Sequence, residues 1–163
     1  MLVGDFYFTE DRKIAEPSTI TTNSKEDSDL QDGYKINQCG SITDTKTDLE
    51  WYIGPDKNLT WEEAINWTRQ LNACGGGWRM PTISEIKTLY NPNLEAGTGF
   101  LAGGQYWKAH IHPVFQAIGG GSWVWSNESV GNTEARSFNL NQGKAVKYSR
   151  SNITYSTRAF AVR

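Results

Sequence analysis

The apolar positions of residues 61–90 repeat at the spacing of an amphipathic helix, in two separate runs. Apolar side chains recur every three or four positions in residues 61–73, and again in residues 83–90. A threonine precedes each run and a glutamate follows three positions later, as in a capping box; the pairs are Thr60 with Glu63 and Thr82 with Glu85. The sequence therefore predicts two helices, at residues 61–73 and 83–90.

The segment between these helices, residues 75–81, combines three consecutive glycines with Trp78, Arg79 and Pro81. Glycine readily adopts the left-handed conformation that terminates a helix, and proline disfavours helical geometry at the residue before it. We expect the glycines to end the first helix. Trp78 would bury apolar surface and Arg79 would pair with Glu85 or with backbone carbonyls, which makes the segment part of the scaffold. A ligand-binding Trp-Arg pair suited to a sugar acid is the alternative.

Short apolar or alternating runs outside the helices predict strands. They are residues 4–8, 34–38, 49–53, 123–127, 135–140, 145–149 and 159–163. Turn formers at residues 43–48 predict a hairpin between the second and third of these strands, and residues 141–143 predict a second hairpin turn. Strands, then two helices, then more strands indicate an α+β domain rather than a doubly wound sheet.

Residues 91–122 hold seven glycines and scattered aromatic side chains, with little periodicity. This pattern predicts a long irregular excursion, and loops of that length often carry function. Residues 16–33 are rich in Ser, Thr, Asp and Asn, which favours a loop or an arm. We therefore divide the chain into residues 1–35, an amino-terminal strand and polar arm, and residues 36–163, the folded domain.

The composition fits one domain without a membrane span. The 163 residues suffice for one core, and no run of 18 apolar residues is present. The first residues lack the basic start and apolar core of a signal peptide, so an exported chain would already have lost its leader.

The net charge of −2 at pH 7 hides an asymmetry between the two ends of the chain. Residues 1–63 carry 14 acidic and 6 basic side chains, whereas residues 131–163 carry 6 basic side chains and the single acid Glu134. The cationic end permits attraction to anionic ligands, or is a solvated strand face balanced by the acidic end.

The two cysteines, Cys39 and Cys74, stand 35 positions apart and match neither a redox pair nor a zinc-ligand spacing. They could be free thiols of a cytoplasmic protein, or they could bond to each other. Cys39 ends an apolar segment and Cys74 lies at the predicted helix end, which are common anchoring points. We favour the disulfide and, with it, an oxidising compartment.

Several segments occur in an order that carries a family resemblance. They are DTKTDLEW at residues 44–51, TWEEA at residues 60–64, GWRMPTISEI at residues 77–86, PVF at residues 113–115, WS at residues 125–126 and RAFAVR at residues 158–163. Over about residues 36–163 the chain resembles the C-terminal domain family of the Legionella collagen-like adhesin. One departure is Asp48, where the family usually has glycine; aspartate tolerates the left-handed conformation, so the turn can survive.

The resemblance implies a C-type lectin-like fold, with two helices packed on a mostly antiparallel, twisted sheet with long loops. It also implies a secreted or surface-exposed bacterial protein, distantly similar to formylglycine-generating enzymes. Those enzymes use cysteine chemistry late in the domain, and this chain has no cysteine after Cys74. The two histidines, His110 and His112, have no acidic or cysteine partner nearby in the sequence. We expect no enzyme, with a metal site at the histidines as the alternative.

Calcium is the one cofactor that the resemblance to C-type lectins suggests. Asn93, Asn127 and Glu128 are superficially similar to the oxygen ligands of sugar-binding C-type lectins, but they supply few converging oxygens. We expect no cofactor and keep calcium as the alternative. No nucleic acid partner is expected, because the pI of 5.7 is acidic and no recognition motif is present.

These observations predict a non-enzymatic adhesion domain outside the cytoplasm, at the cell surface, in the medium or in the periplasm. The expected ligand is an anionic polysaccharide or surface glycan, bound by the strand ends and residues 91–122. The candidate ligand-binding residues are Arg136, Lys144, Lys147, Tyr148, Arg150, Tyr106 and Trp107. The alternative is a structural or assembly domain that contacts another protein, such as a host or cell-surface protein, or a second copy through the amino-terminal arm.

Overall fold

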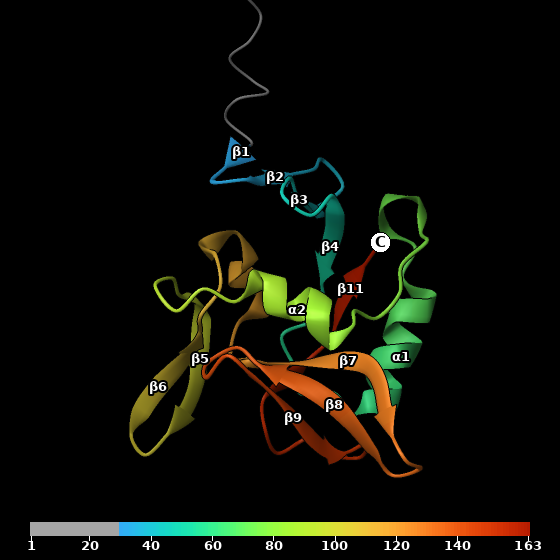
Figure 1. Cartoon of the computed structure of the whole chain (residues 1–163), viewed down its shortest axis with the longest axis vertical. Coiled ribbons are helices and arrows are strands. Elements are labelled where there is room, and N and C mark those ends of the chain that lie inside the picture. The colour runs from blue at the N-terminus through green and yellow to red at the C-terminus, as the bar shows by residue number, and fades with distance from the viewer. Residues whose placement is uncertain (1–29) are drawn as a thin grey trace, which may run out of the picture.

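The strands form three sheets in the computed structural model, which describes residues 30–163 (Figure 1). The first sheet is antiparallel throughout and has the order β1-β2-β3-β4-β11. Its strands are β1 (Leu30–Gln31), β2 (Tyr34–Ile36), β3 (Ile42–Asp44), β4 (Leu49–Ile53) and β11 (Phe160–Val162). β2 straddles the expected boundary between residues 35 and 36. The predicted strand at residues 4–8 and most of the predicted arm lie outside the described residues.

The second sheet has the order β10-β7-β8-β9. Its strands are β7 (Trp123–Val130), β8 (Glu134–Asn139), β9 (Lys144–Ser149) and β10 (Thr157–Arg158). β10 runs parallel to β7, and the other neighbours are antiparallel. The third sheet is a hairpin of β5 (Ala96–Ala102) and β6 (Gln105–Ala109), which projects from the body of the molecule (Figure 1).

Residues 30–163 also contain two α-helices and two 3-10 turns. They are α1 (Trp61–Gln70), η1 (Ala73–Gly75), α2 (Ile83–Leu89) and η2 (Pro113–Ile118). Both predicted capping boxes are confirmed, since Thr60 and Thr82 exchange hydrogen bonds with Glu63 and Glu85. The α+β class with mostly antiparallel sheets is likewise confirmed.

The first helix is three residues shorter than the predicted 61–73 and ends before the glycines. α1 stops at Gln70 and Leu71 is extended, whereas the three glycines, which have positive φ, end η1 and follow it. The reason is tertiary: a disulfide holds Cys74, and Arg163 donates to the carbonyl of Cys74 at 3.0 Å and to the carbonyl of Gly76. The second helix ends at Leu89, one residue earlier than predicted.

The predicted hairpin of residues 34–38 and 49–53 contains an additional strand. β3 lies between β2 and β4 and pairs with both, so residues 42–44 are strand, and of the predicted turn at residues 43–48 the residues 45–48 form the turn. Asp48 has φ 60° there, which confirms that aspartate accepts the left-handed conformation at this position.

The expectation of an irregular excursion at residues 91–122 is wrong, because these residues form β5, β6 and η2. Gly97 and Gly99 have φ of 76° and 78° and lie in a register shift between Ala96 and Phe100. The bulge interrupts the alternation of side chains, which hides the strand from a periodicity argument. β10 was also not predicted, and β7 extends to Val130.

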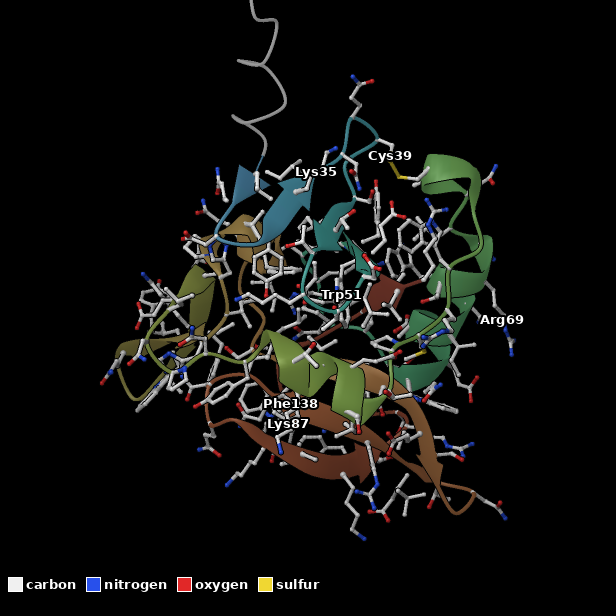
Figure 2. All side chains as sticks on the ribbon, turned by 45° about the horizontal axis from the view of Figure 1, so that its top comes forward. Lys35, Cys39, Trp51, Arg69, Lys87 and Phe138 are labelled. Carbon is white, nitrogen blue, oxygen red and sulfur yellow. A yellow bond between two sulfur atoms is a disulfide. The ribbon has the colours of Figure 1, made fainter. Side chains whose placement is uncertain are left out.

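The core consists of two clusters on opposite faces of β7 and β8. The larger cluster joins Val124 and Phe138 to α2, η2 and the first sheet, where Trp51 is fully buried (Figure 2). The smaller cluster joins Trp125 and Ala135 to α1. Arg69 on the outer side of α1 points to solvent (Figure 2).

The disulfide between Cys39 and Cys74 is confirmed, with the two Cα atoms 5.4 Å apart (Figure 2). It joins the loop after β2 to η1, two segments that no strand pairing connects. No helix among the described residues is long and apolar enough to cross a membrane.

Candidate functional site

A groove of about 380 Å³ lies between the β5–β6 hairpin and one end of the second sheet, where β7 begins and β8 ends. We call it the aromatic groove and define it by its lining residues: Phe100, Ala102, Gly103, Trp107, Trp123, Asn139, Asn141 and Gln142. It joins the segment 91–122 to a strand end, which is the combination that the sequence predicted for a binding surface.

The hairpin presents Trp107 to the groove. Phe100 and Trp107 are directly opposite in the register of β5 and β6, so they share one face of the hairpin. The indole nitrogen of Trp107 donates to the carbonyl of Ala102 at 3.2 Å, and its backbone carbonyl accepts from the Ser122 hydroxyl at 3.0 Å. These bonds hold a side chain that is 38% exposed.

The other wall belongs to the second sheet. Trp123, Asn139 and Lys144 are cross-strand neighbours on β7, β8 and β9, so all three side chains lie on the same face of the sheet. Trp123 packs against Phe100, with the ring centroids 4.8 Å apart. The aromatic side chains of the hairpin and the sheet thus form one continuous surface.

The turn between β8 and β9 supplies carboxamide groups. The Asn139 side-chain oxygen accepts the backbone N–H of Asn141 at 2.9 Å and that of Gln142 at 3.1 Å. The Asn141 amide donates to the carbonyl of Lys108 at 2.9 Å, which ties the turn to the hairpin. Gln142 is exposed, so its amide is free to meet a ligand. Aromatic faces beside amide donors and acceptors suit a sugar ring, which has an apolar C–H face and a hydroxyl edge.

The structure divides the predicted cations between two faces of the sheet. Lys144 and Tyr148 lie on the face that carries Trp123, whereas Arg136 and Lys147 lie on the opposite face. Lys147 is 3.1 Å from a carboxylate oxygen of Glu134, and Arg136 is 3.8 Å from one of Glu128. Among the described residues, Lys144 makes no ion pair within 4.0 Å, and it stands next to the aromatic groove.

Arg150 and Tyr148 have structural contacts. The Arg150 guanidinium stacks 4.5 Å from the ring of Trp61 and donates to the carbonyls of Gly131 and Glu134 at 2.9 and 3.2 Å. Tyr148 stacks on Tyr155 with the ring centroids 4.6 Å apart. Burial, and to a lesser degree the neighbouring Tyr155, raises the pKa of Tyr148. Tyr155 in turn packs on Trp123, so Tyr148 supports the groove indirectly, whereas Arg150 packs on α1 at the other end of β9.

Tyr106 is not brought together with Trp107. It pairs with Leu101 across the hairpin, on the face opposite Trp107, because neighbouring residues of a strand point to opposite sides. Tyr106 is 62% exposed and Leu101 is 61% exposed. The aromatic groove therefore contains Trp107 without Tyr106.

Phe100, Trp123 and the three carboxamide residues of the groove were not among the predicted site residues. The predicted turn at residues 141–143 was a usable signal for them, since it places Asn139 opposite Lys144. The approach of the hairpin to this turn was not predictable, because β5 and β6 were themselves missed.

Trp78 and Arg79 make scaffold contacts of the kind that the sequence predicted, and both also line a pocket of about 350 Å³, so the ligand-binding alternative stays a prediction. The Arg79 guanidinium makes two hydrogen bonds to the Glu85 carboxylate, at 2.8 and 2.5 Å. These bonds hold the pKa of Glu85 below its ordinary value. Trp78 is 8% exposed, donates to the carbonyl of Ala73 at 2.7 Å and stacks against Arg163.

The two histidines have different hydrogen-bond partners, and the candidate calcium ligands Glu128 and Asn93 lie near opposite ends of α2. A ring nitrogen of His110 is 3.0 Å from the carbonyl of Leu94, whereas His112 accepts the backbone N–H of Val114. Glu128 accepts the backbone N–H of Ile83 at the start of α2, and Asn93 follows the other end of that helix. The expectation that no cofactor is bound stays a prediction.

A family model described as the Lcl C-terminal domain matches residues 40–163, which confirms the resemblance inferred from the sequence motifs. No curated protein and no solved structure matches the chain. The match extends over β3 to β11 and includes every residue of the aromatic groove. Since it covers more than half of the sequence, the chain belongs to the Lcl C-terminal domain family.

Proposed function

We propose that this domain is a non-enzymatic adhesion domain that binds a surface polysaccharide in the aromatic groove. The observation that carries the proposal is the lining of that groove, in which Trp107 and Trp123 face a carboxamide-rich turn with Lys144 beside it. Membership of the Lcl C-terminal domain family supports an adhesin-associated role. The polysaccharide itself is inferred from the chemistry of the lining.

A location outside the cytoplasm is part of the proposal. The Cys39–Cys74 disulfide supports it, because such bonds persist in oxidising compartments. We also propose that the α+β architecture is C-type lectin-like, which the arrangement of two helices on mostly antiparallel sheets supports.

The binding mode follows from the lining residues. A sugar ring would stack on Trp107, while its hydroxyl groups would exchange hydrogen bonds with Gln142 and Asn141. Lys144 would meet a carboxylate or sulfate on the same or the next sugar, which is the source of a preference for anionic chains. Arg136 and Lys147 would not take part, because they lie on the other face of the sheet.

The test compares Trp107→Ala, Lys144→Glu and Lys147→Glu on a glycan array, each with and without calcium. The two lysine variants change the net charge equally and lie on the same strand but on opposite faces, so they are a matched pair. We expect Trp107→Ala and Lys144→Glu to lose binding, and Lys147→Glu to retain it with its salt dependence. Loss of binding in Lys147→Glu alone would assign the ligand to the opposite face and overturn the groove.

A second candidate function is assembly with another protein. The observation that favours it is the exposed pair Leu101 and Tyr106, on the face of the β5–β6 hairpin opposite Trp107. Exposed apolar side chains on a protruding element are typical of protein contacts. The amino-terminal arm that the sequence suggested for this role lies outside the described residues.

A further inference from the structure

A pocket of about 350 Å³ lies between α1 and the segment 78–80, with Asn127 of β7 on its third side. The α1 positions that line it are three or four residues apart and therefore share one face of the helix; they are Trp61, Ile65, Thr68 and Arg69. The pocket shares no lining residue with the aromatic groove. We call it the cationic pocket.

The aromatic walls of the cationic pocket are held in place by other parts of the fold. The indole nitrogen of Trp61 donates to the carbonyl of Ser126 at 2.8 Å. A guanidinium stacks on each ring: Arg150 lies 4.5 Å from the centroid of Trp61, and Arg163 lies 4.4 Å from that of Trp78. The walls are thus preformed, which lowers the entropy cost of binding a ligand.

The charge of the lining is positive. Arg69 and Arg79 line the pocket, and among the described residues no acidic side chain does. Arg79 is paired with Glu85, which lies outside the lining. Arg69 points to solvent (Figure 2), and within residues 30–163 its side chain has neither an ion pair nor a hydrogen bond. Aromatic walls beside an unpaired guanidinium suit a ligand that combines an apolar group with an anion.

Residues 5–11 of this chain, DFYFTED, have the matching chemistry. They combine three consecutive aromatic side chains with three acids and contain no base. In an extended segment alternate side chains share a side, so Phe6, Phe8 and Glu10 would face the same way. Two aromatic rings followed by a carboxylate complement tryptophan walls followed by a guanidinium. Because an aromatic side chain buries about 150–250 Å² when it packs, such a segment gains from an apolar surface.

We propose that residues 5–11 bind in the cationic pocket of their own chain, as a docked amino-terminal segment. Phe6 and Phe8 contact the walls formed by Trp61 and Trp78, and Glu10 pairs with Arg69. The proposal is independent of polysaccharide binding, since the aromatic groove is formed by other residues.

The length of the connection allows the segment to reach the pocket. Residues 12–29 join it to β1, and at roughly 3.3 Å per residue they span at most about 60 Å. A domain of this size is roughly 35–40 Å across, so every point of its surface is within reach. A tethered segment acts at an effective concentration of about a millimolar, which exceeds that of a second copy in a micromolar solution. Docking within one chain is therefore favoured over docking between chains.

The experiment places the photoreactive residue p-benzoylphenylalanine at position 8 of the full chain, in place of Phe8. After irradiation, mass spectrometry of the digested protein should find crosslinks to residues 61–69 or 78–80. A mixture of ¹⁴N- and ¹⁵N-labelled chains separates the two sources of the segment. Crosslinks that join peptides of the same label support the proposal, whereas crosslinks between labels would assign the pocket to a second copy. Crosslinks confined to other surfaces would overturn the pocket.

Arg69→Glu tests the ion pair, and Lys87→Glu is its control. Both side chains are exposed cations on helices and both variants change the charge equally, but Lys87 does not line the pocket. We expect the crosslink yield at the pocket to fall at least about threefold in Arg69→Glu, as for the loss of one exposed ion pair, and to stay unchanged in Lys87→Glu. Equal yields in both variants would contradict the pairing with Arg69.

A second measurement does not depend on the photoreactive residue. Two-dimensional amide NMR of the full chain is compared with that of Phe6→Ser with Phe8→Ser, and Ile14→Ser with Ile20→Ser is the control that removes two apolar side chains outside the segment. The amide signals of α1 should shift in the first double variant and not in the second. If they shift in neither and no crosslink reaches the pocket, the docked segment is refuted.

Discussion

Arg158 is a buried cation whose contacts connect three parts of the chain. Its guanidinium donates to Asp56 at 2.7 and 3.2 Å, to Asn58 at 2.6 Å and to the carbonyl of Ile118 at 3.3 Å. Asp56 also accepts the backbone N–H of Gly120 at 2.9 Å. The network holds the end of η2 against β10, which positions the base of the projecting hairpin.

Gly119 is the residue in this network that tolerates least change. Its φ is 58°, and an added Cβ would lie 2.0 Å from a carboxylate oxygen of Asp56. Gly119→Ala is therefore expected to destabilise the fold by about 2–4 kcal/mol, from the left-handed strain and the displaced ion pair. The measurement is the free energy of unfolding from urea denaturation.

Gly131→Ala is the matched control for this substitution. Gly131 has nearly the same φ, 56°, but nothing lies within 4 Å of its added Cβ. It should lose only the conformational part, about 1–2 kcal/mol. Equal losses in the two variants would show that the Asp56–Arg158 pair contributes nothing at Gly119.

Glu50 makes part of the stability depend on pH. A hydrogen bond from Arg163 is the main cause that lowers the pKa of Glu50, and Ser41 adds to it, while burial opposes both. Because the pKa is lower in the folded state, the contribution is fully present above the unfolded value of about 4.3 and is lost as the pH falls through the folded pKa.

Glu50→Gln should therefore be less stable than the natural chain at pH 7, and the difference should shrink as the pH falls from 5 to 3. Urea unfolding of both proteins across this range measures the effect. A difference that stays constant with pH would show that Glu50 acts only through packing.

At the scale of elements, the disulfide joins segments that secondary structure leaves unconnected. It closes a loop of 35 positions between the β2–β3 connection and η1. In the chain-entropy model, a loop of this size contributes about 4 kcal/mol by restricting the unfolded chain. Reduction by dithiothreitol should lower the free energy of unfolding by roughly that amount. An unchanged unfolding curve after verified reduction would refute this.

The elements also show where sequence reasoning succeeds. α1 and α2 begin where their capping boxes predicted, because Thr60 and Thr82 act on residues three positions away. β5 could not be found in the same way, since Gly97 and Gly99 interrupt its alternation and its partner β6 lies beyond two further glycines. β10 is two residues long and exists only because β7 runs beside it.

At the scale of the whole molecule, the projecting hairpin tests the assembly alternative. Leu101→Ser with Tyr106→Ser removes its exposed apolar face without touching Trp107. If the hairpin mediates self-association, light scattering coupled to size-exclusion chromatography should show an oligomer for the full chain and a smaller species for the double variant.

Removal of residues 1–29 is the companion experiment, because it removes most of the amino-terminal arm and keeps β1 and β2. A smaller species only after truncation would assign assembly to the arm. A monomer in all three proteins would leave polysaccharide binding as the function without self-association.

The candidate site could be predicted only in part. Trp107 and Lys144 were named from the sequence, and the structure places both at the aromatic groove or beside it. Arg136 and Lys147 were grouped with Lys144 because their charges are close in the chain. The pleat separates them, since alternate side chains of a strand face opposite sides of the sheet.

The amino-acid sequence by itself determined the α+β class, both helix starts, the strand positions of β4, β8, β9 and β11 and the family, because short-range patterns specify each of these. The tertiary structure decided the end of α1, the pairing of Cys39 with Cys74 and the two pockets. Those features depend on residues that are distant in the chain, such as Trp107 and Asn141 or Trp61 and Asn127. Their proximity results from packing and strand register, which no local sequence pattern predicts.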